Sequence, residues 1–141
     1  MIFRIERFCP LPAAEAWRRV TDWERHAALV PLTTVVVTGE RSFTARTGLG
    51  RAAFDDPMEI VRWEPPDTGG GAGRCRLEKR GRVVLGWAEI EVWPRERGSR
   101  VVWREDLRVR PLPRVLDRPT AWAGRLLFGR ALDGLLARAH Q

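Results

Sequence analysis

The spacing of hydrophobic residues changes along this chain, and its longest uninterrupted pattern lies at the C-terminal end. From Asp117 to Gln141 the spacing is helical, and no proline follows Pro119, which suits a first helical turn with Asp117 as its cap. About 20 residues can therefore form one helix of about 30 Å. One hydrophobic stripe consists of Phe128, Ala131, Leu132, Leu135, Leu136 and Ala139, and a second, rotated stripe of Trp122, Ala123, Leu126 and Leu127. The wide apolar arc of the first half fits either plain packing on a sheet or the covering of a ligand cavity.

The preceding chain alternates like strands, with one helical interruption. The expected strands are residues 1–8, 33–38, 48–54, 58–64, 74–80, 83–93 and 100–109, and two short helices are expected at 13–20 and from the cap Asp22 to about Leu29. A turn is expected over 39–47, and another at Asp55-Asp56-Pro57. The glycine-rich residues 69–71 precede a strand, so they indicate a hairpin connection and no phosphate-binding loop. At 141 residues, the chain is expected to form a single domain over 1–141, of the α+β class.

Two hairpins fix an expected register for the last three strands. A two-residue turn at Gly81-Arg82 would place Leu77 opposite Gly86, and a four-residue loop over 95–98 would place Ala88 opposite Glu105. The face expected to point inward holds Cys75, Leu77, Lys79, Val84, Gly86, Ala88, Ile90, Val92, Val101, Trp103, Glu105, Leu107 and Val109. The opposite face is expected to carry the rows Arg74–Glu89–Arg104 and Arg76–Trp87–Asp106, where charges pair across strands and arginine lies on tryptophan.

The inward face is undersized near Gly86 and Ala88, which predicts a space between the sheet and the long helix. Glu105 would lie in that space, either paired with Arg51 or Arg62, exposed through a local twist, or acting as a general acid or base or a polar anchor. The ligand-binding residues expected around it are Arg51, Arg62, Cys75, Leu77, Lys79, Gly86, Ala88, Ile90, Trp103, Leu107, Trp122 and Leu126. Lys79 is expected near the rim, with its charge reaching solvent.

Composition removes several other functions. The net charge of +7 comes from arginines spread along the chain, so nucleic-acid binding is not expected. The two cysteines are far apart and outside any CxxC pair, and two histidines without clustered acids make no metal site; neither a metal nor a cofactor is expected. With no leader sequence and no apolar run long enough to span a bilayer, a cytoplasmic location is expected.

Several segments resemble the START-like, or SRPBCC, superfamily, near its polyketide cyclase/dehydrase and lipid-transport branch. They are residues 9–17, 21–26, Pro31, 63–66 and 98–103, within a similarity that covers essentially the whole chain. The resemblance implies a helix-grip fold, in which a seven-stranded antiparallel sheet curls around a long C-terminal helix, with two short helices after the first strand and a cavity for hydrophobic ligands.

Three functions follow for such a chain. The first is the binding of a small hydrophobic ligand, such as a lipid or polyketide, in a cavity of at least about 300 Å³. An acidic or carbonyl headgroup of this ligand is expected to meet Arg51, Arg62 or Lys79. The second is a metal-free cyclase or dehydratase with Glu105 as acid/base, although the chain lacks the tyrosines that cyclase-like members use. The third is a partner-binding module that uses Trp87 and Trp93. A monomer or a homodimer is expected.

Overall fold

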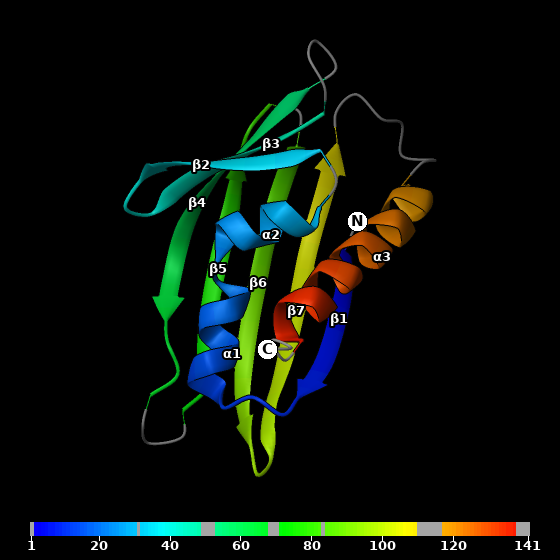
Figure 1. Cartoon of the computed structure of the whole chain (residues 1–141). Coiled ribbons are helices and arrows are strands. Elements are labelled where there is room, and N and C mark those ends of the chain that lie inside the picture. Colours follow the sequence, from blue (N-terminus) through cyan, green and yellow to red (C-terminus); the bar gives the residue numbers. More distant parts are fainter. Residues whose placement is uncertain are drawn as a thin grey trace.

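The computed structural model describes residues 2–30, 32–48, 53–67, 71–82, 84–109 and 117–137 (Figure 1). Strand β1 is followed by the short helices α1 and α2, then by six strands, and finally by the long helix α3. The bounds are β1 Ile2–Cys9, α1 Ala13–Val20, α2 Trp23–Leu29, β2 Thr33–Gly39, β3 Ser42–Thr47, β4 Phe54–Glu64, β5 Gly73–Arg80, β6 Val84–Arg95, β7 Gly98–Val109 and α3 Asp117–Leu136. This order confirms the expected α+β class.

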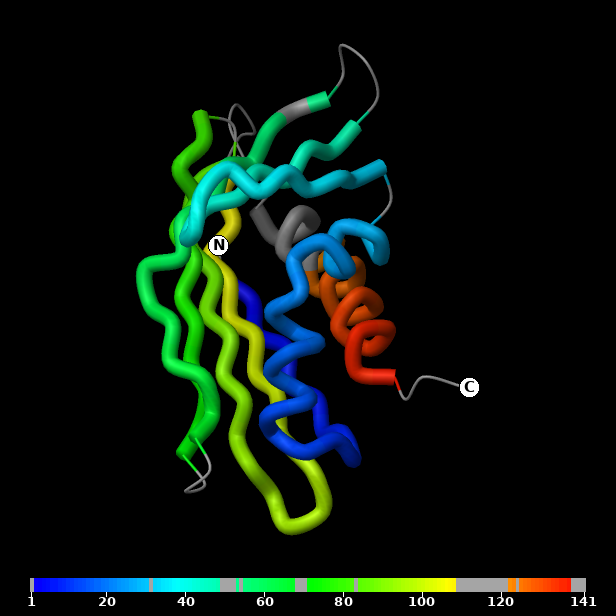
Figure 2. Tube along the Cα trace, turned by 60° about the vertical axis from the view of Figure 1, so that its left-hand side comes forward, coloured from blue at the N-terminus to red at the C-terminus, as the bar shows by residue number. Residues whose placement is uncertain are grey.

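The seven strands form one antiparallel sheet in the order β1-β7-β6-β5-β4-β3-β2. All three helices lie on one side of it, and the end that carries β2 and β3 bends over them (Figure 2). Helix α1 packs on β6 and β7, α2 on β2, and α3 on β1, α1 and α2. The sheet and the long helix therefore enclose the hydrophobic core between them, which confirms the helix-grip architecture.

Alternation explains why β5 has one buried face. Cys75, Leu77 and Lys79 are buried, whereas Arg76 and Glu78 between them are partly exposed, as the twofold repeat of a strand requires. Helix α1 buries Ala16, Trp17 and Val20, and α2 begins where the Asp22 carboxylate accepts a hydrogen bond from the Arg25 backbone N–H at 3.2 Å. Both short helices and the Asp22 cap are confirmed.

The predicted turns at 39–47 and 55–57 were wrong. Strand β3 occupies most of the first, because Phe43 points into the core while its neighbours stay near the surface, and β4 runs without interruption through the second. Asp55 and Asp56 lie on opposite faces of β4, and Asp56 points inward. A buried ion-pair partner far along the chain keeps Asp56 in a strand, and local turn preferences do not report such a partner.

The register between β6 and β7 is confirmed, with Ala88 opposite Glu105. The predicted register between β5 and β6 was wrong by two residues, because Leu77 lies opposite Ala88 and Lys79 opposite Gly86. A shift of two residues leaves every side chain on its predicted face, so hydrophobic alternation alone cannot distinguish the two registers.

Helix α3 buries only one of its two predicted stripes. Ala131, Leu132, Leu135 and Leu136 are buried and Phe128 is partly buried against the core, whereas Trp122 is 67% exposed and Leu126 and Leu127 are also largely exposed. The predicted cover formed by the second stripe is therefore absent at these side chains. Ala139 and the predicted end of the helix at Gln141 lie outside the described residues.

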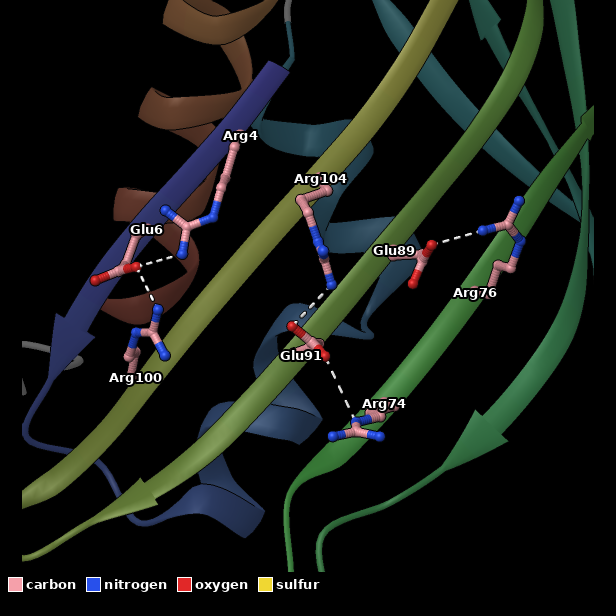
Figure 3. Close-up of polar contacts among 8 residues, drawn as sticks. All are labelled: Arg4, Glu6, Arg74, Arg76, Glu89, Glu91, Arg100 and Arg104. Carbon is pink, nitrogen blue, oxygen red and sulfur yellow. Dashed lines mark hydrogen bonds and ion pairs between the residues drawn. The ribbon is translucent and has the colours of Figure 1, made fainter. Parts of the chain in front are cut away.

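The outer face of the sheet carries ion pairs that join neighbouring strands (Figure 3). Glu91 on β6 contacts Arg74 on β5 at 3.5 Å and Arg104 on β7 at 3.1 Å, and Arg76 contacts Glu89 at 2.6 Å. Cross-strand pairing is thus confirmed, but the predicted row Arg74–Glu89–Arg104 is replaced, because the corrected register brings Glu91 to Arg74.

The same face continues onto β1 at the edge of the sheet. Glu6 accepts hydrogen bonds from Arg100 and Arg4, each at 2.7 Å, and these two contacts, Arg100 first, lower the pKa of Glu6 to about 2 (Figure 3). On the other strands, Arg76 lies over the Trp87 ring at 4.7 Å, as predicted. Much of the arginine surplus in the sequence is therefore held by the sheet exterior.

Candidate functional site

A cavity of about 110 Å³ lies between the concave face of the sheet, helix α2 and Phe128 of α3. Its walls are mostly apolar and include the rings of Trp23, Phe43, Trp103 and Phe128, which pack on one another. Six polar side chains also reach it: His26, Thr33, Thr47, Asp56, Lys79 and Glu105. The volume is below the 300 Å³ that the sequence led us to expect, and it suits a single ring better than an extended chain.

Three charged side chains from three strands meet at this cavity. Lys79 of β5 donates a hydrogen bond from Nζ to Asp56 Oδ2 of β4 at 2.7 Å, and the same Nζ lies 3.8 Å from Glu105 Oε2 of β7. The other Glu105 oxygen accepts a hydrogen bond from Trp103 Nε1 at 3.1 Å. The three charged side chains are almost completely shielded from solvent, and Glu105 is 1% exposed.

The small residues of β6 explain how Lys79 comes near Glu105. Strand β6 separates their two strands, and its residues opposite them are Gly86 and Ala88. No large side chain at these two positions stands between the ammonium and the carboxylate.

Gly86 is required by the backbone as well. Its φ is +124°, and a Cβ at this position would lie 1.8 Å from the Asp106 carbonyl oxygen on β7. Because β6 and β7 approach so closely here, the absence of a side chain at Gly86 is primarily a feature of strand pairing. From the sequence, the small residue at this position was predicted to leave space for a ligand.

The charged cluster has more hydrogen-bond acceptors than it uses. Asp56 Oδ1 and Glu105 Oε2 are buried and have no hydrogen-bond partner among the described residues. Two carboxylates face a single ammonium, so the fully ionised cluster carries one surplus negative charge. A buried acceptor without a partner is costly, which makes these two oxygens the natural contacts for a bound polar group.

The cavity also changes the protonation of its charged groups. Burial raises the pKa of Glu105, against the opposing effects of Lys79 and the Trp103 hydrogen bond, and burial likewise raises the pKa of Asp56 against Lys79. Burial works to lower the pKa of Lys79, but the Glu105 and Asp56 carboxylates outweigh it and raise that pKa. The lysine stays charged, and protonation of a carboxyl is the way the cluster can lose its surplus charge.

His26 contributes a neutral polar group to the cavity wall. Its Nε2 lies 2.6 Å from the Val20 carbonyl oxygen, so Nε2 carries a proton and donates it, while the ring packs against Trp103 and Trp23. Burial lowers the pKa of His26, against the effect of the Val20 hydrogen bond. In the neutral tautomer, Nδ1 is left as an acceptor.

Five residues predicted for the site line the cavity, namely Leu77, Lys79, Ala88, Trp103 and Glu105. Arg62 was wrong as a partner of Glu105, because it is exposed and pairs with Glu64. Arg51, the other expected partner, lies outside the described residues. Lys79 was expected at the rim, but it is buried, because two carboxylates satisfy its charge without solvent.

The remaining predicted residues lie elsewhere in the described structure. Cys75 and Ile90 belong to the hydrophobic core, where burial raises the pKa of the Cys75 thiol to about 12. Leu107 packs against that core from a partly exposed position. Trp122 and Leu126 line a separate surface hollow on α3, and they do not reach the cavity.

Sequence reasoning missed four of the polar side chains described at this site, namely His26, Thr33, Thr47 and Asp56. Asp56 is spaced two residues from Met58 and four from Ile60, so the signal was present once 54–64 is taken as one strand. His26 follows Trp23 by three residues and therefore lies on the same helical face. Lys79 offered a further signal, because it is the only lysine among 25 basic residues.

Two absences apply to the described part of the chain. Within it, no group of three or more histidine, cysteine, aspartate or glutamate side chains is placed to hold a metal ion. Within the same residues, no helix has the length and hydropathy needed to cross a membrane.

The arrangement of sheet and helices defines a class of protein, the helix-grip α+β fold with a cavity between the sheet and its helices. Solved structures place this chain within that class. A START superfamily protein from Mycobacterium smegmatis matches with a TM-score of 0.74 and 10% identity, covering 96% of both chains. The chain thus has the START-like (SRPBCC) fold.

Two enzymes share the fold at similarly low identity. The Zhui aromatase/cyclase from Streptomyces sp. R1128 matches with a TM-score of 0.61 and 13% identity, covering 95% of this chain and 93% of that one. Norcoclaurine synthase from Thalictrum, solved with a transition-state analogue, matches with a TM-score of 0.60 and 12% identity, covering 96% and 93%. No family model and no curated protein matches the sequence.

Proposed function

We propose that this chain binds a small hydrophobic molecule in the cavity between its sheet and helices. The observation that carries the proposal is the buried Glu105 Oε2, which has no hydrogen-bond partner in the described part of the chain and lies in a cavity walled by aromatic rings. Such a site combines apolar surface with few polar anchors, as ligand pockets generally do. The fold is shared with a START superfamily protein, an aromatase/cyclase and norcoclaurine synthase, which supports the same function.

The cavity volume limits which part of a ligand it can hold. About 110 Å³ accommodates a ring or a short branched group. A lipid or polyketide would place one ring or short branched group in the cavity. The rest of the molecule would fit only if the helices and strands around the cavity moved apart.

Native mass spectrometry of gently purified protein tests the proposal. We expect a noncovalent adduct of low molecular mass, or, after its removal, chemical-shift changes at cavity residues when toluene is added. The matched variant is Ala88→Leu, whose larger side chain fills the cavity floor and should abolish both responses. Absence of both the adduct and the toluene response in the wild type would contradict ligand binding.

A cyclase-like or dehydratase-like reaction is the second candidate, and one observation favours it. Glu105 has a raised pKa and lies near Lys79, so a carboxyl that can exchange a proton and a fixed ammonium face the same space. In that case Glu105 is the acid/base. Once a ligand is known, Glu105→Gln should abolish turnover and preserve affinity if the chain is an enzyme, whereas a carrier has no rate to lose.

The partner-binding alternative has less support. Trp87 and Trp93 are only partly exposed, because Arg76 and Arg74 lie over their rings at 4.7 and 5.2 Å. A monomeric or homodimeric state stays a prediction, and size-exclusion chromatography with light scattering measures it directly.

A further inference from the structure

We propose that the ligand's polar end is an uncharged hydroxyl group, as in a phenol, which binds at Glu105 and Asp56, and that carboxylated ligands are excluded. This inference rests on the proposed binding function and specifies the chemical class of its ligand.

The hydrogen-bonding capacity of the cavity floor supports a hydroxyl group. The donors there already have neighbours, since Trp103 Nε1 donates to Glu105 and Lys79 Nζ faces Asp56 Oδ2 and Met58 Sδ. Among the described residues, the carboxylate oxygens Asp56 Oδ1 and Glu105 Oε2 are left without a hydrogen-bond partner, and His26 Nδ1 in the cavity wall is a further acceptor. A ligand that donates a hydrogen bond satisfies one of them, whereas a ligand that only accepts does not.

The negative charge in the cavity disfavours ligands that carry a carboxylate. In the residues that the structure describes, two carboxylates and one ammonium share a space from which solvent is largely removed, so a ligand carboxylate would add a third negative charge beside one cation there. Burying a charge without a partner costs several kcal/mol. An anionic ligand is therefore expected to bind poorly, although the cavity contains the positively charged Lys79, because two carboxylates already face that ammonium.

A hydroxyl group also fits both protonation states of the cluster. When Glu105 is ionised, the hydroxyl donates to it, and when Glu105 is protonated, the hydroxyl oxygen can accept from it. A ketone fits only the protonated form and an ammonium only the ionised one. The aromatic walls provided by Trp23, Phe43 and Phe128 complement a ring that carries the hydroxyl.

Three probes of one-ring size test the inference at pH 7 by protein-detected NMR titration: phenol, toluene and benzoate. In the wild type we expect phenol and toluene to bind and benzoate to bind at least about tenfold more weakly than phenol. In Glu105→Leu, which removes the acceptor at similar size, the ratio of phenol affinity to toluene affinity should fall about tenfold or more. Val35→Ala is the control on the apolar part of the cavity wall, and it should leave that ratio unchanged, because both probes lose the same contact.

The outcomes distinguish failure of the hydroxyl assignment from failure of the proposed binding function. If phenol and toluene bind but Glu105→Leu leaves their affinity ratio unchanged, the hydroxyl assignment is overturned and the binding function stands. Benzoate binding as tightly as phenol to the wild type overturns it as well, and this comparison needs no variant if Glu105→Leu fails to fold. If none of the three probes binds the wild type, the binding function itself is refuted and the assignment with it.

Discussion

Replacing Glu105 with glutamine should make the protein more stable at neutral pH. The side chain is 1% exposed, and Gln keeps its shape and can still accept the hydrogen bond from Trp103 Nε1. What disappears is a buried negative charge whose Oε2 accepts no hydrogen bond from any residue that the structure describes, while Lys79 keeps its hydrogen bond to Asp56. We expect the free energy of unfolding at pH 8 to rise by about 1–3 kcal/mol, or about 3–4 °C in Tm per kcal/mol for a domain of this size.

The pH dependence of this gain is fixed by the direction of the pKa shift. Because the pKa of Glu105 is raised in the folded state above its ordinary value of 4.5, the stability contributed by its proton is complete below about pH 4.5. That stability is lost as the pH rises through the folded-state pKa. Glutamine mimics the protonated acid at every pH, so wild type and variant should be nearly equal at pH 4 and diverge as the pH rises.

Urea unfolding at pH 4 and pH 8 measures both quantities. The matched control is Glu59→Gln on the outer face of β4, where the exposed carboxylate pairs with Arg80 at 3.2 Å. It should change the free energy of unfolding by no more than about 0.5 kcal/mol at either pH. A Glu105→Gln variant less stable than wild type at pH 8, or one with an equal gain at pH 4, would refute the argument. It would show that the cost of burying the Glu105 carboxylate does not exceed the stabilisation by Lys79 and Trp103.

Three further substitutions test the same region. Lys79→Met leaves two buried carboxylates without a cation and should lower the free energy of unfolding by about 3–5 kcal/mol in urea; a neutral result would place the ammonium in solvent. Ala88→Leu should abolish the NMR response to toluene, because its larger side chain occupies the cavity, and a retained response would locate the ligand elsewhere. Gly86→Ala should cost at least about 2 kcal/mol in thermal unfolding, because its Cβ would clash with the Asp106 carbonyl at positive φ, and an unchanged Tm would contradict this backbone conformation.

Hydrophobic period predicted the elements better than it predicted their pairing. The stripe around Leu132 and Leu135 and the alternation of β5 are properties of local sequence, so the helix and the inward face of the strands could be predicted from them. The β5–β6 register was not predictable in this way, since a slip of two residues changes which inward residue faces Ala88 without changing any face.

The site was less predictable than the fold for a related reason. Glu105, Lys79 and Ala88 could be assigned to the cavity because strand parity alone decides which side they face. Asp56 could not, because its place in β4 depends on an ion pair with a residue 23 positions later. Trp122 failed for the opposite reason, since a hydrophobic residue on a helix indicates burial only if a partner surface reaches it.

Two costly features coincide in this fold, and their coincidence favours binding over a purely structural role. A cavity forfeits packing contacts, and a buried carboxylate without a full set of partners is destabilising, so a core selected for stability alone would fill the space near Ala88 and replace Glu105 with an apolar residue. A ligand removes both costs at once, because its apolar part restores the missing contacts and its polar group satisfies the carboxylate oxygen. Ligand binding to the folded state also raises the free energy of unfolding by mass action. The free protein should therefore gain more stability from a ligand that does both than from one, such as toluene, that only fills the space.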